Sequence, residues 1–243
     1  MTRSIHRFTD LEALSRAAAR ALVDDVQDVL VTQDRYTLAL AGGSTPKRLY
    51  ELLASGGEGR LPWERIHLFW GDERFVPPGD ERSNYHLVRR SLLTAIDMPP
   101  ENVHPIPTDT ESPESAAAAY EETLRRYFSD RETTFDTALL GLGGDGHTAS
   151  LFPETTALGQ TGDWVRVVEA PPRHDISTRL TCSLPVLNGA RRAVFLVAGA
   201  RKREALRAVL DDQDPSLPAT HVRPRKQIDW YVDHAARPDA DAE

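Results

Sequence analysis

The sequence has one cysteine, no long apolar run and no excess of positive charge, and each shortage excludes a class of protein. With Cys182 alone, no intrachain disulfide can form, so a secreted disulfide scaffold is excluded. A membrane-spanning helix needs about 18 consecutive apolar residues, and no such run occurs. Residues 1–14 also lack the apolar stretch of a secretory signal. We therefore expect a cytoplasmic protein that has no membrane partner.

Negative charges outnumber positive ones, because 37 Asp and Glu residues stand against 29 Lys and Arg residues. The resulting net charge of −8 disfavours nucleic acid as a partner. An anionic substrate would need cationic side chains gathered at one place. The 243 residues are 40% hydrophobic, which is enough for one sizeable core. We expect a single domain over residues 1–236 and a polar tail over residues 237–243.

Apolar strands and amphipathic helices alternate along the chain. Helical spacing of apolar residues predicts helices over residues 10–30, 83–96 and 201–210, and after Pro46 and Ser112. Short apolar runs predict strands over residues 36–41, 66–70, 103–106, 135–140, 165–168, 180–184, 193–198 and 228–232. This alternation predicts an α/β fold with a doubly wound, mainly parallel sheet flanked by helices.

The turn Gly42-Gly43-Ser44-Thr45 follows the first of these strands and precedes a helix. Thr45 is expected to cap that helix and Pro46 to be its first residue. Glycines let the backbone approach a ligand, and a helix N-terminus offers free N–H groups that suit a phosphate. No Gly-Lys-Ser/Thr follows, which disfavours a nucleotide-binding P-loop. These residues alone fit a phosphate site and an ordinary capped turn equally well.

Asp72, Glu73 and Arg74 come directly after the strand predicted over residues 66–70. Three charged side chains cannot be buried there without partners. Either they are solvated at the rim of the sheet or they face a polar site. Ligands of open α/β sheets bind at the carboxyl ends of the strands, which favours the second alternative. Arg74 could then hold an anion or stabilise a developing oxyanion.

The segment 141–153, GLGGDGHTASLFP, presents Asp145 and His147 at the same edge of the predicted sheet. A histidine there could act as a general base near neutral pH, and either Asp145 or Asp72 could place its proton. A short helix is expected after the glycine turn. No two of the eight histidines are spaced as H-x-H or H-x-x-x-H, so we expect no metal ion. Ser150 does not stand in a G-x-S-x-G motif, which disfavours a serine hydrolase.

Another interpretation of this segment is a nicotinamide-binding dehydrogenase. Gly141, Gly143 and Gly146 match the dinucleotide pattern G-x-G-x-x-G, and Glu169 follows at a suitable distance. Two features argue against it. Pro153 allows only a short helix after the turn, and a carboxylate inside the turn would face the pyrophosphate. We therefore expect no cofactor.

Three segments resemble the 6-phosphogluconolactonase family: LALAGGSTPKRLYELL, WGDERFVPPGDERSNYHLV and GLGGDGHTASLFP. The resemblance runs in the same order from about residue 8 to residue 236. It implies a fold similar to ribose-5-phosphate isomerase and glucosamine-6-phosphate deaminase. It also implies hydrolysis of 6-phospho-D-glucono-1,5-lactone without a metal or cofactor. In the third segment the sequences of the deaminases resemble DGHIAFNEP, whereas this chain has DGHTASLFP. The Asn-Glu pair of the deaminases is therefore missing here. Gly144 and Glu154 depart from the residues that the family often has.

The resemblance also implies roles for individual residues. The catalytic histidine of the family falls on His147, its substrate-site arginine on Arg74 and its phosphate-binding turn on residues 42–45. Two later basic positions fall on Arg179 and Lys202, which by themselves would be classed as surface cations.

A sugar-phosphate lactone is therefore the expected partner, hydrolysed by general-base catalysis. A sugar-phosphate sensor that performs no catalysis is the rival from another class. Such a sensor would need the phosphate turn but no base, so the intact Asp145 and His147 argue against it.

Overall fold

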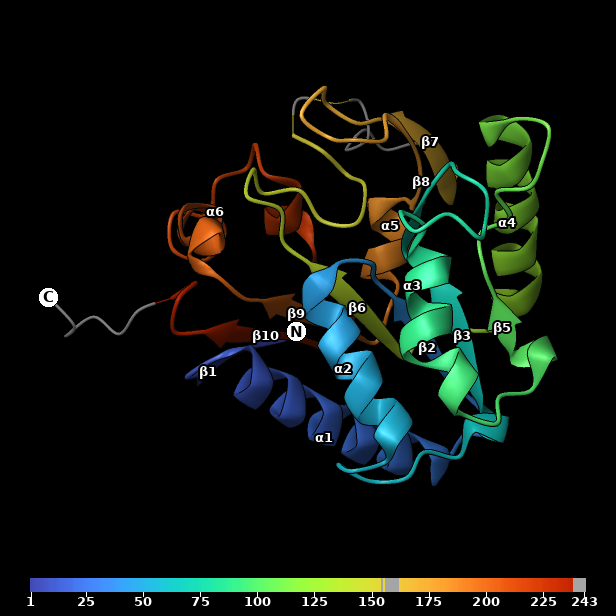
Figure 1. Ribbon diagram of the computed structural model, residues 1–243, viewed down its shortest axis with the longest axis horizontal. Helices are drawn as coiled ribbons and strands as arrows, with labels where there is room; N and C mark the ends of the chain where they lie inside the picture. Colours follow the sequence, from blue (N-terminus) through green and yellow to red (C-terminus); the bar gives the residue numbers. More distant parts are fainter. Residues whose placement is uncertain (154, 156–161, 238–243) are drawn as a thin grey trace, which may run out of the picture.

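The computed structural model describes residues 1–153, 155 and 162–237. Glu154 and most of the predicted tail, residues 238–243, lie outside the described residues. A seven-stranded sheet forms the centre, in the order β1-β10-β9-β6-β2-β3-β5, and every neighbouring pair in it is parallel (Figure 1). Its strands are β1 (Thr2–Phe8), β2 (Tyr36–Leu40), β3 (Ile66–Trp70), β5 (Val103–His104), β6 (Thr137–Gly141), β9 (Arg192–Val197) and β10 (Gln227–Asp233). The predicted doubly wound, mainly parallel sheet is confirmed.

The direction in which strands are added reverses between β2 and β6. From β2 the chain proceeds through β3 to β5 at one edge, and from β6 it proceeds through β9 to β10 on the other side. At such a switch point the connections leave the carboxyl ends of the strands in opposite directions, which opens a crevice for ligands. The two glycine turns that follow β2 and β6 flank this crevice.

A second, smaller sheet lies beside the first. It consists of β4 (Asp72–Arg74), β8 (Thr178–Cys182) and β7 (Val165–Glu169), in the order β4-β8-β7 and with antiparallel pairing. The strand predicted over residues 180–184 is wrong at its end, because Leu184 already begins a helix. The charged residues 72–74 form the edge strand of this sheet, which the sequence analysis did not anticipate.

The α-helices of the described residues are α1 (Leu11–Leu30), α2 (Ser44–Ser55), α3 (Asn84–Ser91), α4 (Pro113–Phe128), α5 (Leu184–Asn188) and α6 (Arg203–Leu210). α1 buries Leu14, Leu22 and Val26 on one face, which is the expected pattern for a helix that covers a sheet. α1 and α2 pack together, whereas α4 lies on the other side of the molecule, next to β7 (Figure 1). Within the described ranges, no helix combines the length and apolarity that crossing a membrane requires.

Three helix ends differ from the prediction. The helix predicted from residue 201 begins at Arg203, because Ala200–Lys202 form a 3-10 turn. α2 begins at Ser44, not at Pro46, because Gly43 with a φ of 102° serves as its N-cap. α3 ends at Ser91, and a separate 3-10 turn follows over Leu93–Ala95. The sequence pattern shows apolar residues through both helical turns and therefore predicted one helix.

Glu73 is a buried carboxylate that fixes the start of α3. Its oxygens accept the backbone N–H groups of Arg74, Asn84 and Tyr85 at 2.7–2.8 Å and the hydroxyl of Ser83 at 3.0 Å. Burial raises the pKa of the Glu73 carboxyl, and these four donors oppose the rise. Glu73 is 1% exposed, so it is neither solvated at a rim nor part of an open site.

We expect Glu73→Gln to lower the free energy of unfolding by roughly 2–4 kcal/mol, because an amide would turn an NH₂ group toward buried donors that then lack an acceptor. Chemical denaturation followed by tryptophan fluorescence measures the difference. Glu81→Gln, at an exposed position of the same connection, is the matched control and should change stability by less than about 0.5 kcal/mol. Equal stability of the two variants would contradict the capping role.

Candidate active site

A cavity of about 300 Å³ lies at the switch point, where β2 and β6 end. Its walls come from the turns after β2 and β6, from β4 and β8, and from the segment that precedes α6. Nine of the predicted site residues line it: Gly42, Gly43, Ser44, Thr45, Asp72, Arg74, His147, Arg179 and Lys202. The tenth, Asp145, is not among the lining residues but contacts His147, which is. The fold thus brings together residues that lie far apart in the sequence.

Asp145, and not Asp72, holds the ring of His147. Oδ1 of Asp145 lies 2.5 Å from Nδ1 of His147 and also accepts the backbone N–H of His147 at 3.2 Å. This geometry assigns the ring proton to Nδ1 and leaves Nε2 free to accept another. Burial alone would raise the pKa of the Asp145 carboxyl, but hydrogen bonds from His147 and Arg173 outweigh burial and hold that pKa well below its usual range. Asp145 therefore remains a carboxylate at any pH near neutrality.

A tight turn brings these two side chains together. Gly146 adopts a φ of 82° and donates its N–H to the carbonyl of Gly143 at 3.1 Å, while the N–H of Gly143 donates to the carbonyl of His147 at 2.8 Å. The prediction of a short helix after this turn is wrong. Thr148 and Leu151, which follow, form an isolated β-bridge instead. The backbone N–H groups of Gly143 and Gly146 bond to carbonyls within the turn itself and do not start a helix.

Asp72 is buried beside the cavity but contacts other partners. Its Oδ2 accepts the hydroxyl of Ser150 at 2.7 Å, and the amide of Asn84 donates to its carbonyl at 2.9 Å and to its Oδ1 at 3.3 Å. Gly42 packs on that amide, since a Cβ at Gly42 would lie 1.7 Å from Oδ1 of Asn84. Asp72 and Asn84 thus set the distance between β4 and the turn after β2. The sequence considered alone did not connect Asn84 or Ser150 with Asp72, because no spacing rule relates these positions.

Arg74 and Arg179 are directly opposite each other in the antiparallel pair β4–β8. Like charges in opposed positions destabilise a sheet. Backbone carbonyls accept one bond from each: Nη1 of Arg74 donates to Arg82 at 2.5 Å, and Nε of Arg179 donates to Ile176 at 2.8 Å. Burial, together with the charge of Arg74, lowers the pKa of the Arg179 guanidinium. Nε of Arg74 is buried and has no hydrogen-bond partner among the described residues. Such a pair is suited to bind an anion.

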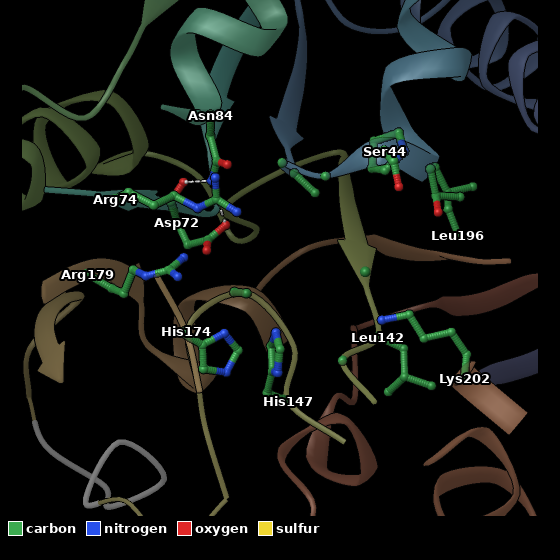
Figure 2. Close-up of a pocket in the computed structure, with 18 of the residues that line it drawn as sticks. Ser44, Asp72, Arg74, Asn84, Leu142, His147, His174, Arg179, Leu196 and Lys202 are labelled. Atoms are coloured by element: carbon green, nitrogen blue, oxygen red, sulfur yellow. Dashed lines mark hydrogen bonds between the residues drawn. The ribbon is translucent and has the colours of Figure 1, made fainter. Parts of the chain in front are cut away.

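Lys202 and the N-terminus of α2 complete the cationic lining. Figure 2 shows Lys202 across the cavity from the two arginines, with His147 between them. Burial lowers the pKa of the Lys202 ammonium. The first N–H groups of any helix have no intrahelical acceptor. The N-cap of α2, Gly43, makes no side-chain hydrogen bond to them either. Ser44 and Thr45 belong to that turn and line the cavity.

His174, which the sequence analysis did not single out, packs against the ring of His147. The two ring centroids lie 5.3 Å apart with an interplanar angle of 77°, and the ring of Phe152 contacts both. Burial, and then the neighbouring His147 and Arg179, lower the pKa of His174. His174 is therefore neutral at neutral pH and restricts the orientation of His147. No spacing in the sequence indicates this tertiary contact.

Asp145, His147 and His174 each offer one ligand atom within 4.8 Å of the others, a set that could hold a metal ion. Histidine spacing alone predicted no such site, because the two histidines meet only in the fold. The carboxylate already has other partners: Oδ1 contacts Nδ1 of His147 and Oδ2 contacts the Arg173 guanidinium. A metal ion would displace both contacts, so the arrangement suits proton transfer better than metal binding.

Comparison with known proteins agrees with the resemblance of the three segments. Residues 9–230 match the family described as glucosamine-6-phosphate isomerases/6-phosphogluconolactonase. A 6-phosphogluconolactonase of Nostoc sp. is 39% identical over 241 residues, 97% of this chain and 98% of that protein. One of Synechocystis sp. is 45% identical over 205 residues, 82% of each chain. The crystal structure of 6-phosphogluconolactonase from Thermotoga maritima is 32% identical with a TM-score of 0.84, and the match covers 96% of this chain and all of that one. This chain therefore belongs to the glucosamine-6-phosphate isomerase/6-phosphogluconolactonase family.

Proposed function

We propose that the protein hydrolyses 6-phospho-D-glucono-1,5-lactone to 6-phospho-D-gluconate, the second step of the oxidative pentose phosphate pathway. One observation carries the proposal: an Asp145–His147 pair faces a cavity that also holds Arg74, Arg179 and Lys202. Three cations in one cavity of a chain with net charge −8 fit an anionic substrate. The names of the similar proteins support the lactone as that substrate.

In the proposed reaction, Nε2 of His147 takes a proton from water while the water oxygen forms a bond to the lactone carbonyl carbon. Negative charge then develops on the carbonyl oxygen, and Arg74 stabilises it. When this intermediate collapses, the bond between the carbonyl carbon and the ring oxygen breaks. The His147 imidazolium returns its proton to that oxygen, which becomes a hydroxyl group. Asp145 keeps the ring oriented and stabilises its cationic form.

The phosphate is proposed to bind between the turn over residues 42–45 and the basic side chains Arg179 and Lys202. Backbone N–H groups at the start of α2 supply donors, and the two side chains supply charge. Anchoring the phosphate holds the carbonyl carbon at a fixed distance from the water that His147 activates. Part of the binding energy is thus used to orient the lactone for attack.

Two alternatives have less support. In a glucosamine-6-phosphate deaminase, the segment after the glycine turn would resemble DGHIAFNEP. This chain has DGHTASLFP there and lacks the Asn-Glu pair. A sensor that performs no catalysis would need the cations but not a hydrogen-bonded Asp145–His147 pair, which is present at 2.5 Å.

The deciding experiment is an assay of freshly generated 6-phosphogluconolactone with the purified protein, against the spontaneous hydrolysis in the same buffer. Acceleration far above the background is expected. The same sample, tested with glucosamine 6-phosphate and by fluorescence titration with nicotinamide nucleotides, should show neither deamination nor binding. Hydrolysis at the background rate would refute the lactonase proposal.

Replacing Lys202 with alanine is expected to raise KM about 10- to 100-fold and to change kcat little, because a phosphate contact is alike in the ground and transition states. Initial rates over a range of lactone concentrations separate the two constants. Arg201→Ala removes an exposed neighbouring cation that is not among the residues lining the cavity, and it serves as the control. A large loss of kcat at unchanged KM would exclude a simple phosphate-binding role for Lys202.

A further inference from the structure

Arg173 contacts the catalytic pair from outside the cavity. It lies in a turn after β7, in which the N–H of His174 donates to the carbonyl of Pro171 at 3.0 Å. Its guanidinium forms an ion pair with Oδ2 of Asp145, whereas His147 uses Oδ1. The side chain of Arg173 is 54% exposed, and it is not among the residues that line the cavity. Arg173 therefore acts on His147 through the carboxylate between them.

We propose that Arg173 is a positioning residue that sets the pH range in which His147 serves as the base, an inference that rests on the proposed function. The Asp145 carboxylate stabilises the protonated form of His147, because opposite charges attract over this short distance. A guanidinium on the other carboxylate oxygen neutralises part of that attraction and also repels an imidazolium. Arg173 thus keeps a larger fraction of His147 neutral at a given pH.

The remaining charged or titratable groups near His147 occupy different positions. Those that line the cavity with it are Asp72, Arg74, His174, Arg179 and Lys202. Nε2 of His174 lies 3.9 Å from Oδ2 of Asp145, but His174 is neutral at neutral pH because its pKa is lowered by burial and by His147. Arg74 and Arg179 have Asp72 beside them, across the cavity in Figure 2. Lys202 faces the cavity, where substrate phosphate would balance its charge. Arg173 is a full cation in direct contact with Asp145.

The test compares the pH dependence of kcat/KM in wild type, Arg173→Gln, Arg173→Lys and Arg20→Gln, with background hydrolysis subtracted at each pH. Arg173→Gln should move the acid limb of the profile to higher pH by about 0.5–1 unit and leave the plateau at high pH unchanged. Arg173→Lys keeps the charge and should keep the wild-type profile. Arg20 lies on α1 and pairs with Glu58. Arg20→Gln gives the same change in net charge without contact to the Asp145–His147 pair, and this variant should also match wild type.

Salt provides a second comparison. The screening length falls from about 10 Å at 0.1 M salt to about 3 Å at 1 M, so the difference between wild type and Arg173→Gln should narrow at high salt. A rate loss at every pH with an unmoved acid limb would mean that Arg173 only holds its turn, and would overturn the proposal. A raised KM with an unmoved limb would make Arg173 a substrate ligand and would also overturn it.

A readout that needs no activity separates this inference from the proposed function. The titration of the His147 ring in the free protein can be followed by NMR, assigned with a His147→Gln sample. Its midpoint should be at higher pH in Arg173→Gln than in wild type or Arg173→Lys. If the midpoint moves although the protein hydrolyses no lactone, the electrostatic role stands and the proposed function fails. An unmoved midpoint overturns the role of Arg173, whatever the protein hydrolyses.

Discussion

Replacing His147 with alanine is expected to lower kcat for lactone hydrolysis by about 10²- to 10⁴-fold, the contribution typical of a general base. KM should change little, because the proposed phosphate ligands Lys202, Arg179 and the turn after β2, which line the same cavity, remain in place. The remaining rate would come from orientation of the substrate and from Arg74, the cation proposed to stabilise the carbonyl oxygen. Initial rates with freshly generated lactone, corrected for spontaneous hydrolysis, measure the effect.

His234→Ala is a suitable control for this variant, since His234 is exposed and follows β10 on the chain. It should retain the wild-type rate. If acceleration survives in the His147 variant, the substrate assignment stands but the base lies elsewhere, and Asp72 becomes the next candidate. Asp72 already contacts Ser150 and Asn84. To act as the base it would have to exchange these contacts for a contact with water.

The second large effect is expected from Gly143→Ala, a change that leaves every predicted catalytic side chain in the sequence. A Cβ at this position would lie 2.0 Å from Nδ1 of His147 and 2.5 Å from Oδ1 of Asp145. These distances are too short for a Cβ contact, so the His147 ring, the Asp145 carboxylate or the turn itself must shift, which disturbs the 2.5 Å contact between the two side chains. Displacing a catalytic group by about 1 Å can cost about 10²-fold in rate, and we expect kcat to fall by at least that factor. Circular dichroism should show that the fold is retained.

Gly141→Ala is the matched control, because nothing lies within 4 Å of the Cβ that it would add. Gly141 is the last residue of β6 and Gly143 lies in the turn that follows it. Neither has a positive φ, so the comparison tests the space for a Cβ and not the backbone conformation. The Gly141 variant should keep most of its activity. Full activity of Gly143→Ala would mean that catalysis does not depend on the Asp145–His147 contact.

The parallel sheet could be predicted because its buried strands are short apolar runs that end in glycines or charges. β3 and β9 illustrate this, since nearly all of their residues are buried and their composition shows it. β1 could not be predicted in this way. It is an edge strand with polar residues at most positions and is half exposed, so neither apolar content nor strict alternation marks it.

Part of the candidate site could be predicted from position alone. Residues that follow parallel strands meet at one edge, which is why the turns after β2 and β6 were associated with a ligand. The same rule could not choose between Asp72 and Asp145 as the partner of His147, because both follow strands that end there. Arg173, His174 and Asn84 enter through tertiary packing of segments far apart in the chain, which no local pattern reports.

The position of β1 has a consequence for synthesis of the protein. Its only neighbour in the described sheet is β10, which follows all the other described strands in the chain and is therefore synthesised after them. β1 therefore leaves the ribosome before β10 and has no partner while the segments between them are made. An unpaired strand edge invites association with other chains, and Arg3, His6 and Arg7 oppose it by charge and polarity. The composition that concealed this strand in the sequence protects it in the nascent chain.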